Sequence, residues 1–424
     1  AAVGGIPAGG VQQGGAPVPV DVAPWAARLR WTDPWTGRET TAEAGLDALI
    51  ALRGAAAAND RPIVTAGLTP WKRRCAAPFL AGPCGPARHV RTEAAAARAA
   101  ARVGGRVALW GTRGRAPDAL RLEDGFIRSV GLGLRHTPPA SLSASIHGLH
   151  FDCTRIGDLE RVLVAAAPGP DALSRAARLR ARLIAEGVTK YNLTARAAPL
   201  PDTSRLRVLV PGQVEDDASL RWGAPGVRRN ADLLRAARAR HPGAFILWRP
   251  HPDVETGMRP GAVDAATLAA CADGVARDAS AQDCLSWADR VDCMTSLMGF
   301  EALLRGIPVA TYGRPFYAGW GLTEDLSPAL PHPAPPAALT GPPLPPRGPG
   351  DLPFSRGRRL ALDTLVWGAL IAHPRCIDPA TRLPATPERL LDAIAEDRAA
   401  ATGWPRRVRD ALRGATSRVL NRLG

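Results

Sequence analysis

The sequence predicts an α/β protein of two lobes in which short strands alternate with helices. With 424 residues, 46% of them hydrophobic, the chain can form two domains that each bury a core. In the second half of the chain, apolar runs with strand character alternate with helical segments. Units of strand, helix and strand of this length are typical of a parallel sheet.

The first predicted lobe begins near Pro62. Its expected elements, in order, are a strand from 64 that leads into a loop at 71–72, a helix over 92–103, a strand over 107–111, a glycine-rich loop over 122–133 and a helix over 170–186. The glycine-rich loop carries the adjacent carboxylates Glu123 and Asp124, and its glycines allow the backbone to approach a ligand closely.

The second predicted lobe alternates more regularly. Its expected elements are a strand over 206–210, a helix from its cap Asn230 to Arg240, a strand over 245–253 that ends in a histidine between prolines, a strand over 290–296, a helix over 297–305 stopped by Gly306, and a strand over 308–312. Helices return from about Leu360. An arginine-rich amphipathic helix over 404–423 is expected to dock on the protein or to rest on an anionic membrane, and we favour docking.

These features divide the chain into five predicted segments. They are 1–58, a Gly/Ala-rich start with the remnant of an upstream module; 59–200, the first lobe; 201–326, the second lobe; 327–350, a Pro-rich insertion; and 351–424, C-terminal helices. The upstream module is inferred from an internal repeat, in which the pattern from Asp33 to Ala48 recurs without a gap from Asp378 to Ala393. Chance similarity in an Ala-rich chain is the weaker alternative.

Composition excludes several classes of protein. The formal charge is +15, but the arginines are interspersed with acids and form no stripe interleaved with aromatic residues, so no nucleic-acid partner is expected. The 7 cysteines form no CxxC pair and no metal-ligand spacing, which favours reduced thiols and a cytoplasmic protein. No apolar run is long enough to span a bilayer, and no signal peptide is recognisable.

An acidic triplet follows the first strand of the second lobe. Glu215, Asp216 and Asp217 come directly after Pro211-Gly212, where the strand ends. Enzymes with α/β folds place their chemistry at the carboxyl ends of parallel strands. Three adjacent acids repel one another, so they indicate either a solvated turn or a site where a reaction uses at least one of them.

Other polar residues are predicted at the same edge of the sheet. His251 ends a strand between two prolines, and it is either a ligand-binding imidazole or a satisfied core residue. Thr295 and Ser296 precede a helix whose unpaired amides suit a phosphate, and Glu301 can accept hydrogen bonds from ribose hydroxyls. The alternatives are that Thr295 and Ser296 form an ordinary N-cap and that Glu301 is a solvated helix residue. No cluster resembles a metal site, and amides, hydroxyls and an imidazole can hold a single phosphate without one.

Five ordered motifs carry a resemblance to a known family. They are Glu123-Asp-Gly-Phe-x-Arg-Ser, Pro211-Gly-Gln-Val-Glu-Asp-Asp-Ala-Ser, His251-Pro-Asp, Thr295-Ser-x-x-Gly-Phe-Glu-Ala-Leu and Pro315-Phe-Tyr-Ala-Gly-Trp-Gly-Leu-Thr. Over residues 60 to 400 the chain resembles the capsular-polysaccharide β-Kdo transferases of the KpsC/LipA type, most closely the C-terminal of their two modules. The resemblance implies a GT-B-like glycosyltransferase of two Rossmann-like lobes, here with a helical C-terminal tail.

The resemblance also implies an activity, the transfer of Kdo from CMP-β-Kdo to a Kdo-terminated glycolipid with retention of configuration and without a cofactor. Retention by carboxylates normally requires two displacements through a glycosyl-enzyme adduct. The expected nucleophile is Asp217, with Asp216 or Glu215 as alternatives, and the expected acid/base partner is Glu123 or Asp124. Arg128 is expected to clamp the Kdo carboxylate. The other residues expected to bind the donor or substrate are Lys190, Gln213, Asp216, His251, Thr295, Ser296 and Glu301.

The partners implied by the resemblance belong to a Gram-negative capsule pathway. They are CMP-β-Kdo, a poly-Kdo linker on phosphatidylglycerol, other capsule-assembly proteins and the inner-membrane surface, where the protein is expected to be peripheral on the cytoplasmic side. O7 is the expected acceptor hydroxyl, and O4 is the alternative. The stretch Ser145-Ile-His-Gly-Leu-His-Phe-Asp152 replaces the family's Asp and a Tyr, which leaves acceptor recognition open. A catalytically silent module that scaffolds capsule assembly is the alternative function.

Overall fold

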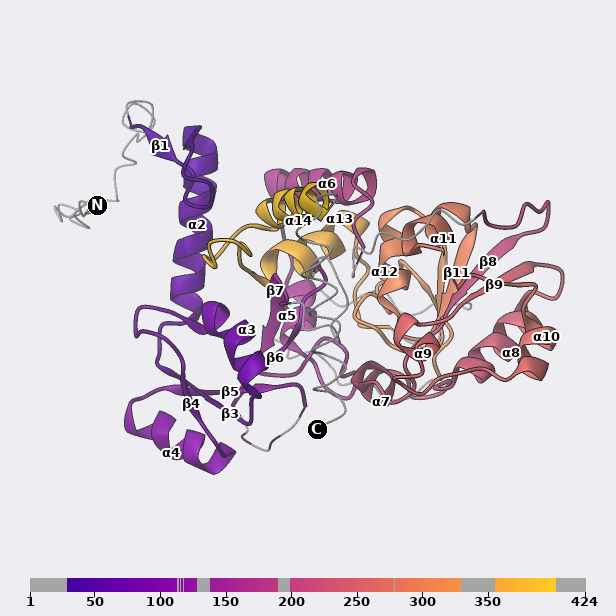
Figure 1. The fold of residues 1–424 in the computed structure, drawn as a ribbon, viewed down its shortest axis with the longest axis horizontal. Coiled ribbons are helices and arrows are strands. Elements are labelled where there is room, and N and C mark those ends of the chain that lie inside the picture. Colours follow the sequence, from indigo (N-terminus) through magenta and orange to yellow (C-terminus); the bar gives the residue numbers. More distant parts are fainter. Residues whose placement is uncertain are drawn as a thin grey trace. The chain divides into compact units, whose positions relative to one another are not determined.

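The computed structural model describes residues 29–112, 114, 116, 118–127, 138–189, 199–277, 279–328 and 355–401 (Figure 1). The chain forms two compact units, Ala1–Ile50 and Ala51–Gly424. Of the predicted features, Arg128, Lys190, nearly all of the Pro-rich insertion and the helix over 404–423 lie outside the described residues. In the part that is described, no helix combines the length and the apolar character needed to cross a membrane.

The small unit is a hairpin followed by the start of a helix. Strand β1 (Trp31–Thr32) pairs antiparallel with β2 (Glu39–Thr40), and α2 (Ala42–Ala58) follows. The carboxylate of Asp33 accepts hydrogen bonds from the backbone of Trp35 and Thr36, at 2.7 and 3.2 Å, which closes the turn.

The same turn recurs near the end of the described chain. Strand β14 (Arg375–Cys376) is followed by Asp378, whose carboxylate accepts from the amides of Ala380 and Thr381, and α14 (Pro387–Ala401) begins at the same spacing as α2. Arg382, with φ of 62°, occupies the position of Gly37, with φ of 70°. The repeat in the sequence is therefore also a repeat of local structure. That residues 1–58 are the remnant of an upstream module stays a prediction.

The second copy of the turn contains a buried ion pair that the first copy lacks. Asp378 is fully buried and accepts from Arg389 Nε at 2.8 Å, and Arg389 also pairs with Glu396. We expect Asp378→Ala to lower the free energy of unfolding by about 2–4 kcal/mol, because Arg389 Nε and the amides of Ala380 and Thr381 lose their acceptor and Arg389 keeps only Glu396 as a charged partner. Denaturant unfolding measures this. Asp33→Ala is the matched control, and an equal loss in both variants would contradict the role of the ion pair.

The first lobe is built on a six-stranded sheet with the order β14-β7-β6-β5-β3-β4. Its strands besides β14 are β3 (Ile63–Ala66), β4 (Arg88–Val90), β5 (Arg106–Trp110), β6 (Leu120–Asp124) and β7 (Ser141–Ser145). Strands β3 to β6 are parallel, and β7 pairs antiparallel with both of its neighbours, β6 and β14. Its helices are α3 (Pro70–Leu80), α4 (Glu93–Arg102), α5 (Asp158–Val164) and α6 (Pro170–Ala185).

Two local predictions for this lobe were wrong. Glu123 and Asp124 were placed in a loop, but they are the last residues of β6, because they pair across the sheet with Ser143 and Leu142 of β7. Lys72 was placed in a loop, but it lies in the first turn of α3, where its amide donates to the capping hydroxyl of Thr69.

The second lobe is built on a fully parallel six-stranded sheet with the order β10-β9-β8-β11-β12-β13. Its strands are β8 (Arg207–Pro211), β9 (Phe245–Arg249), β10 (Gly274–Val275), β11 (Arg290–Cys293), β12 (Val309–Thr311) and β13 (Glu324–Asp325). Its helices are α7 (Ala218–Gly223), α8 (Asn230–Arg240), α9 (Pro252–Glu255), α10 (Ala265–Cys271), α11 (Ala281–Trp287) and α12 (Leu297–Leu304). The predicted parallel sheet is confirmed.

Asn230 was predicted to cap α8 but is its first helical residue. Its side chain turns instead to two loops, accepting from the amide of Gln213 at 3.0 Å and donating to the carbonyls of Gln213 and Gly261 at 2.7 and 2.8 Å. The Asn230 side chain is thereby committed to long-range contacts that hold the loop after β8.

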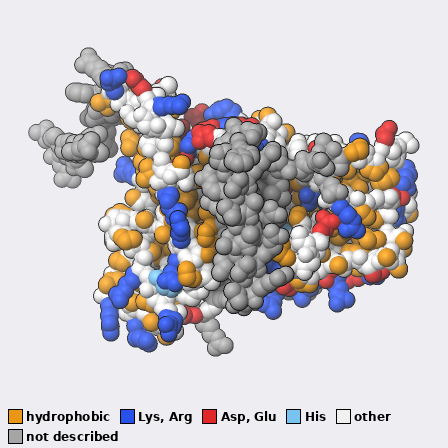
Figure 2. Space-filling model, in the orientation of Figure 1, with side chains coloured by type: hydrophobic (Ala, Val, Ile, Leu, Met, Phe, Trp, Pro, Cys, Tyr) orange, Lys and Arg blue, Asp and Glu red, His pale blue; other side chains and the backbone are white. Residues whose placement is uncertain are grey.

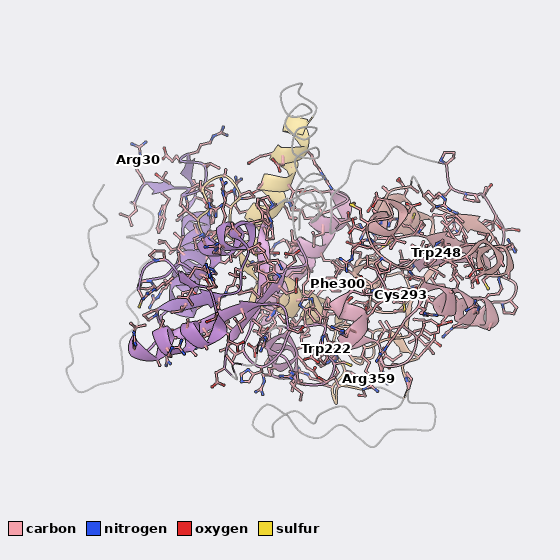
Figure 3. All side chains as sticks on the ribbon, turned by 60° about the horizontal axis from the view of Figure 1, so that its bottom comes forward. Arg30, Trp222, Trp248, Cys293, Phe300 and Arg359 are labelled. Carbon is pink, nitrogen blue, oxygen red and sulfur yellow. The ribbon has the colours of Figure 1, made fainter. Side chains whose placement is uncertain are left out.

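The chain returns to the first lobe after the second. Helix α13 (Leu362–Val366), the π-helical turn η3 (Trp367–Ala372) and α14 pack with α6, together with β14 at the sheet edge (Figure 1). Arg356 is buried and joins the lobes, because it pairs with Glu160 of α5 and donates to the carbonyl of Ala318. Where the lobes meet, Phe300 of α12 faces Phe126 with ring centroids 6.1 Å apart (Figure 3). The predicted α/β fold of two Rossmann-like lobes is confirmed.

Lys and Arg side chains lie in several separate groups on the face in Figure 2, with hydrophobic and uncharged surface between them. Many described arginines are paired with acids, as Arg207 is with Asp289 at 2.6 Å. That the protein has no nucleic-acid partner stays a prediction.

Candidate active site

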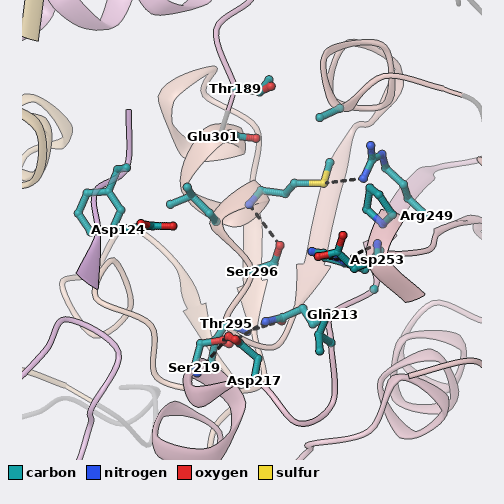
Figure 4. Close-up of a pocket in the computed structure, with 18 of the residues that line it drawn as sticks. Asp124, Thr189, Gln213, Asp217, Ser219, Arg249, Asp253, Thr295, Ser296 and Glu301 are labelled. Carbon is teal, nitrogen blue, oxygen red and sulfur yellow. Dashed lines mark hydrogen bonds and ion pairs between the residues drawn. The ribbon is translucent and has the colours of Figure 1, made fainter. Parts of the chain in front are cut away.

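A cavity of about 530 Å³ is lined by residues of both lobes. The second lobe contributes the segments that follow the carboxyl ends of β8, β9 and β11, and the first lobe contributes the end of β6. This is the edge of a parallel sheet at which α/β proteins bind ligands. The predicted site residues that line the cavity are Glu123, Asp124, Gln213, Asp217, His251, Thr295, Ser296 and Glu301, most of them labelled in Figure 4.

The structure separates the three acids of the triplet. Glu215 accepts a hydrogen bond from the amide of Asn230 at 2.8 Å, and Asp216 forms an ion pair with Arg259 at 2.6 Å; neither lines the cavity. Asp217 caps α7 and does line the cavity. Its carboxylate accepts from the amide and the hydroxyl of Ser219, at 3.2 and 2.5 Å, which fixes its orientation.

Glu123 is a carboxylate with an unusual affinity for protons. Its pKa is raised to about 7, mainly by burial and next by the charge of Asp124, with a smaller contribution from Asp217, while a hydrogen bond from the Asp124 amide and the charge of Lys72 lower it. Glu123 and Asp217 line the same cavity. A carboxyl group with this pKa exchanges protons near neutral pH, as a general acid or base must.

Gln213 lines the cavity and its side-chain amide holds Thr295 by two hydrogen bonds, and that it binds the donor stays a prediction. The nitrogen donates to Thr295 Oγ1 at 2.9 Å, and the oxygen accepts from the Thr295 backbone amide, also at 2.9 Å. Gln213 therefore ties the loop after β8 to the start of α12 and fixes the distance between Asp217 and Ser296.

His251 caps the short helix α9 with its ring. Nδ1 accepts from the amide of Asp253 at 3.1 Å, so in the neutral ring the proton sits on Nε2. The prolines on either side restrict the backbone. The ring thus presents a hydrogen-bond donor on the cavity wall.

The start of α12 forms another part of the wall. Ser296 caps the helix by accepting from the amide of Met298 at 3.3 Å, and Tyr317 donates to the Ser296 carbonyl at 2.5 Å. Glu301 is buried one turn later and lines the cavity. Helix starts attract anions because their first amides have no intrahelical partner.

An aromatic cluster from the motif segments also lines the cavity. The rings of Phe126 and Phe316 stack with centroids 4.2 Å apart, and His150 meets Phe126 edge-on at 4.8 Å. His150, which replaces a Tyr of the resembled family, is part of this cluster. Arg249 and Ser219 were missed, because a lone arginine or serine in this composition gives no signal.

Metal-binding groups do not gather in the part of the chain that the structure describes. Among those residues, no group of three or more His, Cys, Asp or Glu side chains has the geometry to hold a metal ion. That the reaction needs neither metal nor cofactor stays a prediction.

Comparison of the sequence identifies relatives in capsule synthesis. A family model described as "Capsule polysaccharide biosynthesis protein" matches residues 170–338. The capsule polysaccharide modification protein LipA of Neisseria meningitidis serogroup A is 38% identical over 366 residues, which cover 83% of this chain and 48% of LipA. The lipopolysaccharide-processing protein LpsZ of Rhizobium meliloti is 37% identical over 260 residues, 60% of this chain and 53% of LpsZ. The chain spans about half the length of these relatives.

Comparison of the structure identifies two solved structures of KpsC from Thermosulfurimonas dismutans. The first, named a beta Kdo 2,7 transferase, has a TM-score of 0.61 and 31% identity, with 80% of this chain and 99% of that chain covered. The second, named a beta Kdo 2,4 transferase, has a TM-score of 0.63 and 28% identity, with 79% of this chain and 98% of that chain covered. The match therefore extends over nearly the whole of each solved chain.

Proposed function

Because the chain belongs to the KpsC/LipA family of capsule polysaccharide proteins, we propose that it is a retaining β-Kdo transferase that uses CMP-β-Kdo as donor. The observation that carries the proposal is the placement of Asp217 and Glu123 on one cavity, where burial raises the pKa of Glu123 to about 7. Retaining transfer by carboxylates needs such a pair, one as nucleophile and one as acid/base.

The proposed reaction has two displacements. In the first, a carboxylate oxygen of Asp217 attacks the anomeric carbon of Kdo, and the bond to the phosphate breaks with its electrons, so CMP leaves without needing a proton. In the second, a hydroxyl of the acceptor attacks the same carbon, its proton passes to Glu123, and the Asp217 carboxylate is regenerated. Each step inverts the carbon, so the β configuration is retained.

The remaining residues supply binding. His251 Nε2 and the start of α12 at Ser296 would hold the phosphate of CMP, and Glu301 would accept hydrogen bonds from the ribose. Their positions on the cavity wall, within one turn of α12 and at the end of β9, support these roles. Arg128 and Lys190 keep their proposed roles in binding the Kdo carboxylate and the substrate.

The acceptor is proposed to be a glycolipid that ends in β-Kdo, built on phosphatidylglycerol at the cytoplasmic face of the inner membrane, where other capsule-assembly proteins would meet the enzyme. Sequence identity is higher to the 2,7 transferase and the TM-score is higher to the 2,4 transferase, so the two comparisons point to different hydroxyls. We propose O7, and NMR of the product distinguishes it from O4.

Transfer itself is the test of this function. The native chain is expected to extend a synthetic acceptor that ends in β-Kdo, with release of CMP, when CMP-β-Kdo is generated in situ. Absence of both products, with every Kdo-capped acceptor offered, would contradict the proposal.

The pH dependence of transfer should report on Glu123. Its pKa is raised to about 7 from the usual value near 4.5, mainly by burial. Because the second displacement needs the ionised carboxylate, the rate should rise about tenfold per pH unit below 7 and level off above it. Initial rates between pH 5 and 9 measure this; a plateau that extends down to pH 5 would show that Glu123 is not the base.

A catalytically silent scaffold is the second candidate. Ser145, which stands where the family has an Asp, is fully buried, and its hydroxyl has no hydrogen-bond partner among the described atoms. A lost acceptor contact at this position would leave donor binding intact. Binding of CMP-Kdo without any turnover would favour the scaffold, and turnover would exclude it.

A further inference from the structure

The cavity wall contains an arginine that forms no ion pair with any acid among the described residues. Two other arginines on the wall are neutralised, since Arg259 pairs with Asp216 at 2.6 Å and Arg277 with Glu255 at 3.1 Å. The third arginine is Arg249, which also lines the cavity. Its charge is therefore not neutralised by an ion pair within the described part of the chain.

The protein atoms that Arg249 touches are weak partners. Nη1 lies 4.0 Å from the sulfur of Met298, an interaction drawn as a dashed line from Arg249 in Figure 4. The sulfur of Cys284 is a second hydrogen-bond partner of the guanidinium. Burial raises the pKa of the Cys284 thiol to about 11, so this neighbour is uncharged. Arg249 Nε is buried, and no described atom accepts its hydrogen bond.

Burying the Arg249 guanidinium in this way costs free energy unless another group accepts its hydrogen bonds. A partly buried cation and a buried N–H without an acceptor both lose hydration that two sulfur atoms do not replace. Arginine is seldom buried without an anionic partner. An anion that enters the cavity would supply the missing acceptor.

The position of Arg249 indicates which anion. It is the last residue of β9 and sits in register with Pro211 of β8, at the carboxyl edge of the sheet. Its Nη1 contacts Met298, whose amide donates to the capping hydroxyl of Ser296, so the guanidinium lies beside the first turn of α12. A helix start and a guanidinium at one place suit a tetrahedral oxyanion.

We propose that Arg249 binds the phosphate of the nucleotide and compensates its charge as it leaves. The inference rests on the proposed CMP donor. The guanidinium donates charge-assisted hydrogen bonds to the phosphate oxygens, which gain negative charge when the bond to Kdo breaks. Arg249 therefore contributes to the release of CMP as well as to donor affinity.

The test compares CMP with cytidine, which differs only by the phosphate. By calorimetry or competition, Arg249→Gln should weaken CMP binding about 10- to 100-fold and leave cytidine binding within about twofold of the native chain. Arg249→Lys keeps the positive charge but loses the paired N–H donors of the guanidinium. Its CMP affinity should therefore lie between those of the native chain and Arg249→Gln. Unchanged cytidine binding also shows that the variant is folded.

Arg205→Gln is the matched control, because it removes an arginine from the same lobe outside the cavity, where Arg205 pairs with Asp273 at 2.8 Å. Arg205→Gln should leave the affinities for CMP and for cytidine unchanged. Equal CMP affinity of native chain and Arg249→Gln would overturn the inference and leave the proposed transferase intact. If the native chain binds no CMP, the donor assignment fails and the role of Arg249 fails with it.

Discussion

Asp217→Asn should lower kcat for Kdo transfer by at least about 10⁴-fold, because an uncharged amide of the same shape cannot form the glycosyl-enzyme bond. Donor binding should persist, since the amide still fits at the start of α7. Transfer is followed with a β-Kdo acceptor, and CMP release is measured separately. Transfer and CMP release should both be lost, because the substitution blocks the first displacement.

Two variants in the same lobe make this result specific. Asp216→Asn should retain activity within about tenfold, because Asp216 is paired with Arg259 and lies outside the cavity. Asp232→Asn, on the exposed face of α8, should behave as the native chain. A large loss in Asp216→Asn with an active Asp217→Asn would reassign the nucleophile.

Glu123→Gln should lower the transfer rate by about 10²- to 10⁴-fold through loss of the general base. The first displacement needs no proton, so this variant should still release CMP in a burst of about one equivalent before it stalls. Rapid-mixing measurement of CMP separates the two steps, and the pH dependence described above should disappear. Absence of the burst would mean that Glu123 acts in the first step or that the reaction has no adduct.

Glu39→Gln is the matched control for the loss of a carboxylate, because Glu39 is exposed and paired only with Arg30. It should change neither the burst nor the steady rate.

The sequence predicts most of the fold because its elements carry local signals. The helix after Thr92, the helix from Pro170 and the strands at 207 and 309 all lie within a residue or two of the predicted bounds. These segments combine apolar periodicity with clear caps or breakers, and local patterns of that kind survive in the folded chain.

The errors have a common physical cause in long-range contacts. Glu123 looked like a loop residue because its partner strand, β7, pairs with it only in the folded sheet. Asn230 looked like a cap because Asn is a good cap, but its side chain is recruited by Gln213 and Gly261. Neither contact leaves a pattern in the local sequence.

The candidate site could be predicted only in part, because the directions of its side chains also depend on contacts made in the folded chain. That a triplet of acids lies at a strand end follows from the chain itself, but the choice among its members depends on side-chain direction, which the structure supplies. Ser219 holds Asp217 at the cavity, and Arg259 draws Asp216 away. Arg249 could not be predicted, because only the structure shows that no acid among the described residues forms an ion pair with it.

Detection of the glycosyl-enzyme adduct is the most direct test of the proposed mechanism. Glu123→Gln is incubated with CMP-β-Kdo, quenched, digested with trypsin and analysed by mass spectrometry. The proposed mechanism predicts that Kdo is bound to the peptide Val208–Arg221, and fragmentation should place it on Asp217. Kdo on Glu215 or Asp216, or an α-linked product from the native chain, would contradict the proposed mechanism.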